Sequence, residues 1–110
     1  MDNIKGDAYY LEKIIKDLNF LIAHTAHLSE SAFESDEVLL DSVMFRLIQI
    51  SENSSRLTEN FKVLHRQIPW TAMRGLRNRI VHEYGDVDLH IVYETVTQDI
   101  PHLLQMLSSI

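Results

Sequence analysis

The stretch "IKGDAYYLEKIIKDLNFLI", residues 4–22, decides the fold class. Apolar residues recur in it at spacings of four and three, at Ile4, Ala8, Leu11, Ile15, Leu18 and Ile22. Because an α-helix has about 3.6 residues per turn, this spacing puts them on one face. The pattern predicts an amphipathic helix over about residues 5 to 27 that packs through a single apolar stripe.

The same periodicity predicts three more helices. "SESAFESD" interrupts the first segment, and Ser35 or Asp36 can cap a second helix that runs to about residue 58. "QIPW" precedes a third helix over about residues 70 to 83, and Gly85 is typical of its C-terminal end. Asp86 or Asp88 can then cap the fourth helix. The apolar stripes of the second and fourth helices are Leu40, Val43, Leu47, Ile50 and Leu57, and Leu89, Val92, Val96, Ile100, Leu103, Leu104 and Leu107.

Details of these helices predict how they pack. Phe45 and Ile48 give the second helix another apolar face, which predicts contacts on two sides. Pro101 lies within the fourth stripe, where its missing N–H predicts a kink or a break. Trp70 and Tyr93 are most simply interpreted as core or interface aromatics. Strand signals are poor, with few β-branched alternations and no Asn-Gly or Asp-Gly turn.

The sequence therefore predicts an all-α protein, an up-and-down bundle of four to five helices in a single domain over residues 1–110. A chain of this length is small enough for oligomerisation to affect its stability. It has no cysteine, no apolar signal core at the start, and no apolar run of the roughly 20 residues that span a bilayer. We expect a soluble, cytoplasmic protein with no membrane partner.

The charge is unevenly distributed along the chain. The net charge of −6 argues against a nucleic-acid partner. However, residues 60–82 hold Lys62, Arg66, Arg74, Arg77 and Arg79 and no acid, which is half of all the lysines and arginines. The local field decides where a phosphate binds, so this window is a candidate anion-binding region. The alternative is a solvated helix face with chance clustering.

Several kinds of site find little support. His24 and His27 are three residues apart, but two ligands do not make a metal site, and we interpret them as surface histidines. "HE" at 82–83 lacks the second histidine of a zinc-protease motif, because position 86 is Asp. There is no glycine-rich phosphate loop and no nucleophile elbow. We therefore expect neither a metal nor a cofactor.

One polar constellation remains, at Arg77, Asn78, His82 and Tyr84. A histidine can act as a general base near neutral pH, and an arginine offers a fork of donors to a phosphate. Together they suffice for metal-free cleavage of RNA. The histidine would take the proton from a 2′-hydroxyl that attacks the adjacent phosphate, and the arginine would stabilise the developing charge. The catalytic candidates are thus Arg77 and His82, with Asn78, Arg74 and Arg79 in support.

Helix geometry places a condition on this site. Positions 77 and 82 lie about 140° apart on a regular helix. Either the helix ends before His82, as Gly85 allows, or a two-fold dimer brings two arginines and two histidines to one groove. A third interpretation is purely structural: Arg77 pairs with Glu83 or Asp86, and His82 caps the helix end.

At these residues the sequence resembles the HepT-like toxins, a branch of the HEPN superfamily of helical domains. Arg77, four residues, His82, one residue and Tyr84 match the family motif, and "IPW", "RNRIVH" and "DIP" match its flanks. "IQISEN" is similar to the family's Ile-Gly-Glu-Ala segment, with Ser51 in place of the glycine and Asn53 in place of the alanine. The resemblance covers residues 68 to 104 in detail and the rest in architecture.

The resemblance implies a HEPN-like fold and a metal-independent ribonuclease toxin of a bacterial or archaeal type VII toxin–antitoxin pair. It also implies a homodimer and a cognate minimal nucleotidyltransferase antitoxin. That antitoxin would transfer AMP to the motif tyrosine, here Tyr84, so that negative charge and bulk close the groove. The alternative is a non-catalytic HEPN module that binds a nucleotidyltransferase or a nucleotide. The sequence leaves open which RNA is cut.

Overall fold

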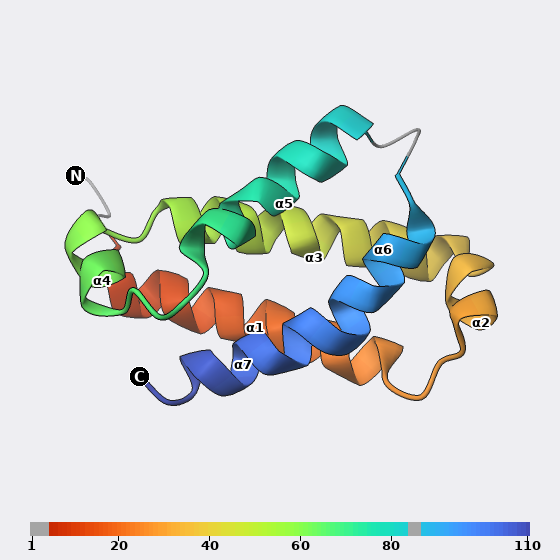
Figure 1. Cartoon of the computed structure of the whole chain (residues 1–110), viewed down its shortest axis with the longest axis horizontal. Helices are drawn as coiled ribbons and strands as arrows, with labels where there is room; N and C mark the ends of the chain where they lie inside the picture. Colours follow the sequence, from red (N-terminus) through yellow and green to blue (C-terminus); the bar gives the residue numbers. More distant parts are fainter. Residues whose placement is uncertain (1–4, 84–86) are drawn as a thin grey trace.

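Two long antiparallel helices, α1 (Asp7–Thr25) and α3 (Glu37–Ser55), lie side by side at the centre of the molecule (Figure 1). Helix α5 (Trp70–Glu83) packs on α3, and α7 (Ile100–Leu107) packs on α1. This computed structural model describes residues 5–83 and 87–110, with the backbone alone at positions 77 and 79–83. In space the main helices therefore follow the order α5, α3, α1, α7, which gives a molecule of 43 × 28 × 23 Å.

Short elements connect the long ones. They are α2 (Glu30–Glu34), α4 (Glu59–Leu64), α6 (Leu89–Glu94) and a π-helical segment, η2 (Thr95–Asp99), which leads directly into α7. Over residues 5–83 and 87–110 the chain contains helices and no strand, so the predicted all-α class is confirmed. The sequence did not predict α2 and α4, since five or six residues are too short to show a helical period.

Side-chain caps start four of the helices. Ser29, Asp36, Thr58 and Asp88 each accept a hydrogen bond from a backbone N–H in the first turn of the helix that follows. Such caps satisfy donors that a helix start leaves without an intrahelical partner. Of the two predicted caps of the second long helix, Ser35 and Asp36, the structure shows Asp36. Asp88 caps α6, as predicted. Asp86 and Gly85 lie outside the described residues.

The buried stripe of α1 differs from the predicted one. Its buried residues are Ile14, Asp17, Leu18, Leu21 and Thr25, so of the predicted stripe Leu18 alone is fully buried within the described part of the helix. Leu11, Ile15 and Ile22 are partly buried against the core, and Ala8 is exposed. The reason is that α1 contacts α3 on one side and α7 with η2 on another. The residues of α1 that lie between these two contacts are therefore the most deeply buried.

Helix α3 buries the predicted Val43, Leu47 and Ile50, and Leu57 is buried just beyond its end. The second apolar face is only partly realised within one chain. Ile48 packs against the core, whereas Phe45 is 56% exposed and Val38, one heptad before it, is 78% exposed. The predicted contacts on a second side are therefore made by Ile48 within the chain, and Phe45 remains exposed. Two apolar side chains of α3 remain at the surface.

Pro101 breaks the last helix as predicted, and the break takes the form of the π-helical segment η2. The Ile100 N–H donates to the Thr95 carbonyl, five residues back, instead of four. Proline has no N–H and its ring crowds the carbonyl four residues earlier, so the wider π turn accommodates it. Pro101 then occupies the first turn of α7, where proline is tolerated.

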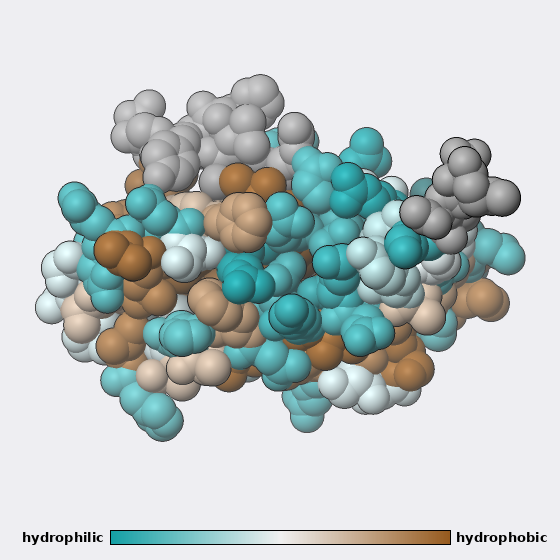
Figure 2. Space-filling model, turned by 180° about the vertical axis from the view of Figure 1, so that it is seen from behind, coloured by the Kyte–Doolittle hydropathy of each residue, from teal (hydrophilic) through white to brown (hydrophobic). Residues whose placement is uncertain are grey.

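The surface is mixed in polarity. Seen from behind, hydrophilic residues are interspersed with smaller hydrophobic areas (Figure 2). None of the helices in residues 5–83 and 87–110 combines the length and the hydropathy that crossing a membrane requires.

Candidate functional site

Helix α5 carries most of the candidate residues. Arg74, Arg77, Asn78, Arg79 and His82 all belong to it. Arg74 and Asn78 are exposed to solvent. The side chains of Arg77, Arg79 and His82, and the whole of Tyr84, lie outside the described residues. The structure therefore shows which helix contains positions 77 and 82 and which residues contact the first turns of that helix.

The course of α5 excludes one way of completing the site. The helix continues to Glu83 as predicted, so it includes position 82, and the alternative in which it ends before His82 is excluded. On this continuous helix the backbone positions 77 and 82 lie about 140° apart. One face of one helix therefore does not present both residues. Either a second chain completes the site, or the two residues act separately.

A buried serine fixes the position of α5. Ser51 of α3 is fully buried, and its hydroxyl donates a 2.9 Å hydrogen bond to the Arg74 carbonyl oxygen. Met73, 2% exposed, turns into the core from the same turn of α5, while Arg74 stays outside. Ser51 occupies the place of a glycine in the family pattern, and here it joins the central helix pair to the motif helix. Sequence reasoning missed this role, since nothing local pairs Ser51 with a carbonyl 23 residues away.

The first turn of α5 is held against α4 by Trp70. Its indole N–H donates to the His65 carbonyl oxygen at 3.0 Å, and its ring lies 6.0 Å from the ring of Phe61, centroid to centroid. Trp70 and Tyr93 are both half-buried and pack against the core. The Tyr93 hydroxyl donates a 2.6 Å hydrogen bond to the Leu28 carbonyl oxygen. The interpretation of both as core or interface aromatics is confirmed, since each packs against the core.

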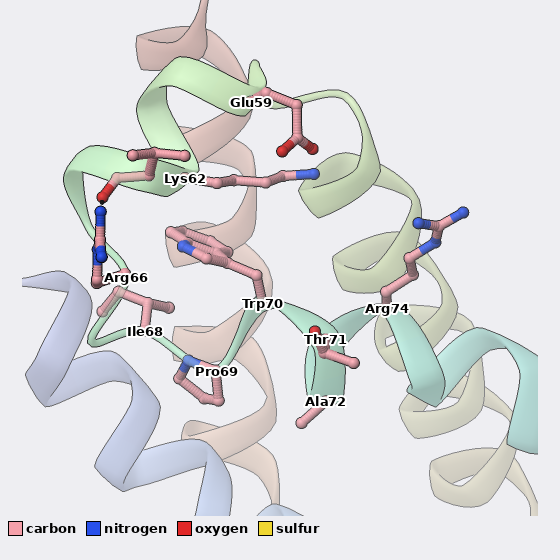
Figure 3. A pocket seen from close by; sticks show the side chains of 10 residues that line it. Glu59, Lys62, Arg66, Ile68, Pro69, Trp70, Thr71, Ala72 and Arg74 are labelled. Atoms are coloured by element: carbon pink, nitrogen blue, oxygen red, sulfur yellow. Dashed lines mark hydrogen bonds between the residues drawn. The ribbon is translucent and has the colours of Figure 1, made fainter.

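An open groove lies between α4 and the start of α5 (Figure 3). Its volume is about 990 Å³. The lining contains three cations, Lys62, Arg66 and Arg74, and it also includes Trp70. These cations are the part of the predicted basic window whose side chains the structure describes, and they share one groove at the N-terminal half of the motif helix.

A cluster of titratable side chains lies where α6, which follows the motif in the sequence, contacts α2. It consists of His90, Glu94, Glu30 and Glu34. His90 Nδ1 lies 2.8 Å from Glu30 Oε2, and His90 Nε2 lies 3.2 Å from Glu94 Oε1. The hydrogen bond and the charge of Glu30, followed by the charge of Glu94, raise the pKa of His90 above its ordinary value. The same hydrogen bond lowers the pKa of Glu30, while hydrogen bonding to Glu30 raises the pKa of Glu34. His90 and Glu94 are exposed, and Glu30 and Glu34 are half-buried, so the cluster links two short helices at the surface rather than forming an enclosed site.

Metal-binding side chains do not gather in the described part of the chain, where no group of three or more His, Asp or Glu side chains could hold an ion. His24 and His27 are both exposed, as expected of surface histidines. His27 takes a positive φ of 67° at the turn that follows α1. This is a conformation in which histidine is enriched among non-glycine residues.

The helical fold, with the motif arginine and histidine at positions 77 and 82 of its third long helix and a tyrosine at position 84 of the sequence, is that of a HEPN-type domain. The model of the family described as "Ribonuclease HepT-like" matches residues 13–110, and this chain belongs to that family. The resemblance noted in the sequence is therefore confirmed.

Relatives are found in bacteria and archaea. The "Putative RNase" of Caldanaerobacter subterraneus subsp. tengcongensis is 33% identical over 101 residues, which cover 92% of this chain and 90% of that protein. The "Probable ribonuclease HepT" of Thermococcus cleftensis is 33% identical over 94 residues, 86% of each chain. No solved structure matches this chain.

Proposed function

We propose that this protein is a metal-independent endoribonuclease toxin that acts as a homodimer and is silenced by addition of AMP to Tyr84. The membership of the HepT-like ribonuclease family carries this proposal, together with the motif at Arg77, His82 and Tyr84. Asn78, Arg74 and Arg79 would support the site through polar and charged contacts with RNA.

The proposed reaction is a transesterification within RNA. His82 takes the proton of a ribose 2′-hydroxyl, whose oxygen forms a new bond to the adjacent phosphorus. The bond to the 5′-oxygen of the next nucleotide breaks, and that oxygen takes a proton from a second histidine, the partner subunit's His82. Arg77 pairs with the phosphate oxygens as charge develops on them. The products are a 2′,3′-cyclic phosphate and a 5′-hydroxyl.

A dimer would bring together the four catalytic groups, Arg77 and His82 of one subunit and the same two residues of its partner. Two observations support it: α5 remains helical through position 82, and Val38 and Phe45 of α3 expose apolar surface. Burial of that surface against a second copy would stabilise the assembly. A cognate minimal nucleotidyltransferase antitoxin would then act on the motif tyrosine.

The proposed switch is an AMP transfer from ATP. The Tyr84 hydroxyl oxygen attacks the α-phosphorus, and pyrophosphate leaves. The added phosphodiester is negatively charged and would pair with nearby arginines, while the adenosine would block access of RNA. Tyr84 itself lies outside the described residues, so this step rests on the motif.

The chemistry is tested with matched RNA substrates. An oligoribonucleotide should be cleaved in the presence of EDTA, whereas the same sequence with 2′-deoxyribose throughout should resist cleavage, because it lacks the nucleophile. Arg77→Ala should reduce the rate by on the order of 10²–10³, the cost of removing one charge-stabilising donor. Cleavage of the deoxy substrate, or an unchanged rate in Arg77→Ala, would contradict the mechanism. A folded protein that cleaves no RNA but binds the nucleotidyltransferase would fit the non-catalytic alternative instead.

A further inference from the structure

The groove between α4 and α5 has the chemistry of a single-strand binding site. Three of its ten lining residues are cations and one, Glu59, is an acid. Within residues 5–83 and 87–110, no ion pair within 4.0 Å involves Lys62, Arg66 or Arg74. Arg66 donates from Nε to the Val63 carbonyl oxygen at 3.4 Å, which leaves its terminal nitrogens for other partners. The groove thus combines an excess of positive charge with donors available to an anion.

Trp70 adds an aromatic surface to the same groove. Figure 3 shows Lys62 extending from α4 past the indole, with Arg74 projecting from α5 beyond it. The indole N–H is already bonded to the His65 carbonyl oxygen, so Trp70 offers its ring rather than a donor. Cations beside an aromatic ring are how proteins hold single strands, because phosphates pair with the cations and bases stack on the ring.

The groove lies along the face of α5 that includes position 77 of the motif. On the regular helix α5, positions 70, 74 and 77 fall within about 60° of one another, so they follow one face. Arg74 precedes position 82 by eight residues, a rise of about 12 Å along the axis. A strand whose scissile bond lies at the motif would therefore pass the groove with a neighbouring stretch of its chain.

We propose that this groove binds the single-stranded RNA that flanks the cleaved bond, with Lys62, Arg66 and Arg74 on phosphates and Trp70 stacked on a base. The inference rests on the proposed ribonuclease function and adds to it a substrate class, because a base within a duplex is not free to stack on Trp70. Each stacked base contributes roughly 5- to 150-fold in affinity at sites of this kind.

Trp70 is the one tryptophan in the sequence, so its fluorescence reports on the groove directly. The titration uses His82→Ala protein, which should bind RNA without cutting it, and a single-stranded oligoribonucleotide of roughly 16 nucleotides, the upper site size of single-strand binding folds. We expect RNA to quench the fluorescence. In the same background, Lys62→Gln with Arg66→Gln should weaken binding and reduce the slope of log affinity against log salt by about 1.4, roughly 0.7 for each phosphate that is no longer neutralised.

A matched variant controls for total charge. Lys13→Gln with Lys16→Gln removes two exposed lysines three residues apart on α1, and it should leave both affinity and slope near those of the parent. The groove proposal is overturned if the Lys62→Gln, Arg66→Gln variant keeps the affinity and salt slope of the parent, as the control does. It is also overturned if saturating RNA leaves the Trp70 fluorescence unchanged while the parent still cleaves RNA. In both cases the ribonuclease function stands. If light scattering shows that the Lys62→Gln, Arg66→Gln variant is a monomer while the parent is a dimer, the groove is a subunit interface and the proposal is also overturned. If the parent neither binds nor cuts RNA, the proposed function itself fails.

Discussion

The ion pair between Asp17 and Arg46 joins α1 to α3 at the centre of the fold and allows a quantitative prediction. Arg46 Nη1 donates to Asp17 Oδ1 at 2.7 Å, with the two side chains 26% and 10% exposed respectively. The guanidinium carbon also lies 3.9 Å from the centroid of the Phe20 ring. Removing the arginine leaves a nearly buried carboxylate without its cation, whereas removing the charge of Asp17 leaves a cation that still has solvent and an aromatic ring.

The two single substitutions should therefore differ in cost. Arg46→Met keeps packing on Phe20 and should lower the free energy of unfolding by about 3 kcal/mol, the lower end for a broken buried pair, because both side chains retain some water. Asp17→Asn keeps an acceptor and should cost about 1 kcal/mol, since the bond loses part of its charge assistance. The double variant has neither charge and should cost about 2 kcal/mol, so the coupling energy is about 2 kcal/mol.

The measurement is urea unfolding followed by circular dichroism, with all variants at one protein concentration because a dimer's stability depends on it. Arg56→Met is the control, because Arg56 is exposed at the end of the same helix and its loss should cost no more than about 0.5 kcal/mol. If Arg46→Met costs no more than Arg56→Met, or the coupling is below about 0.5 kcal/mol, the burial argument is wrong.

Three further predictions concern pH, assembly and modification. The raised pKa of His90 means that its link to Glu30 stabilises the protein fully below the ordinary histidine value of 6.5, and that this stabilisation is lost as pH rises through the raised pKa. His90→Gln should therefore lower the thermal midpoint relative to the parent near pH 5, and the difference should shrink as pH rises above 6.5; a difference independent of pH would contradict this. Phe45→Glu should shift light-scattering mass from dimer toward monomer, whereas a parent that is already monomeric while active would remove the shared-site model. Incubation with the nucleotidyltransferase and ATP should add AMP mass to the parent but not to Tyr84→Phe, and an adduct that persists in that variant would place the acceptor elsewhere.

The local features of the fold could be predicted from the sequence. Helix α5 has the predicted bounds, and Asp36 and Asp88 cap their helices, because caps and breakers act within a few residues. Pro101 likewise produced the predicted break. These features depend on neighbouring residues alone.

Features that depend on packing partners could not be predicted. The buried line of α1 passes through Ile14 and Thr25 because of where α3 and α7 lie, and Thr25 is tolerated there because its hydroxyl donates to the Leu21 carbonyl oxygen at 2.6 Å. Ser51 is buried for a similar reason, through its bond to α5. Apolar periodicity contains no information on such polar groups, since their partners are set by tertiary contacts.

The candidate site divides in the same way. The motif positions and the basic window could be recognised from residue types and spacing. The groove could not, because it forms only when α4 folds back beside Trp70, and α4 itself gave no periodic signal. The sequence therefore located the charges, and the fold determines which of them share a surface.

The cleavage rate of one defined oligoribonucleotide in EDTA, by the parent and by His82→Ala, tests the central claim most directly. The two proteins should be matched in circular dichroism and in dimer content, so that the comparison isolates the imidazole. Loss of a general base predicts a rate lower by on the order of 10²–10⁴ in His82→Ala, with a 2′,3′-cyclic phosphate on the product of the parent. An equal rate in the two proteins would show that this histidine is not the base and that the motif is not the catalytic site.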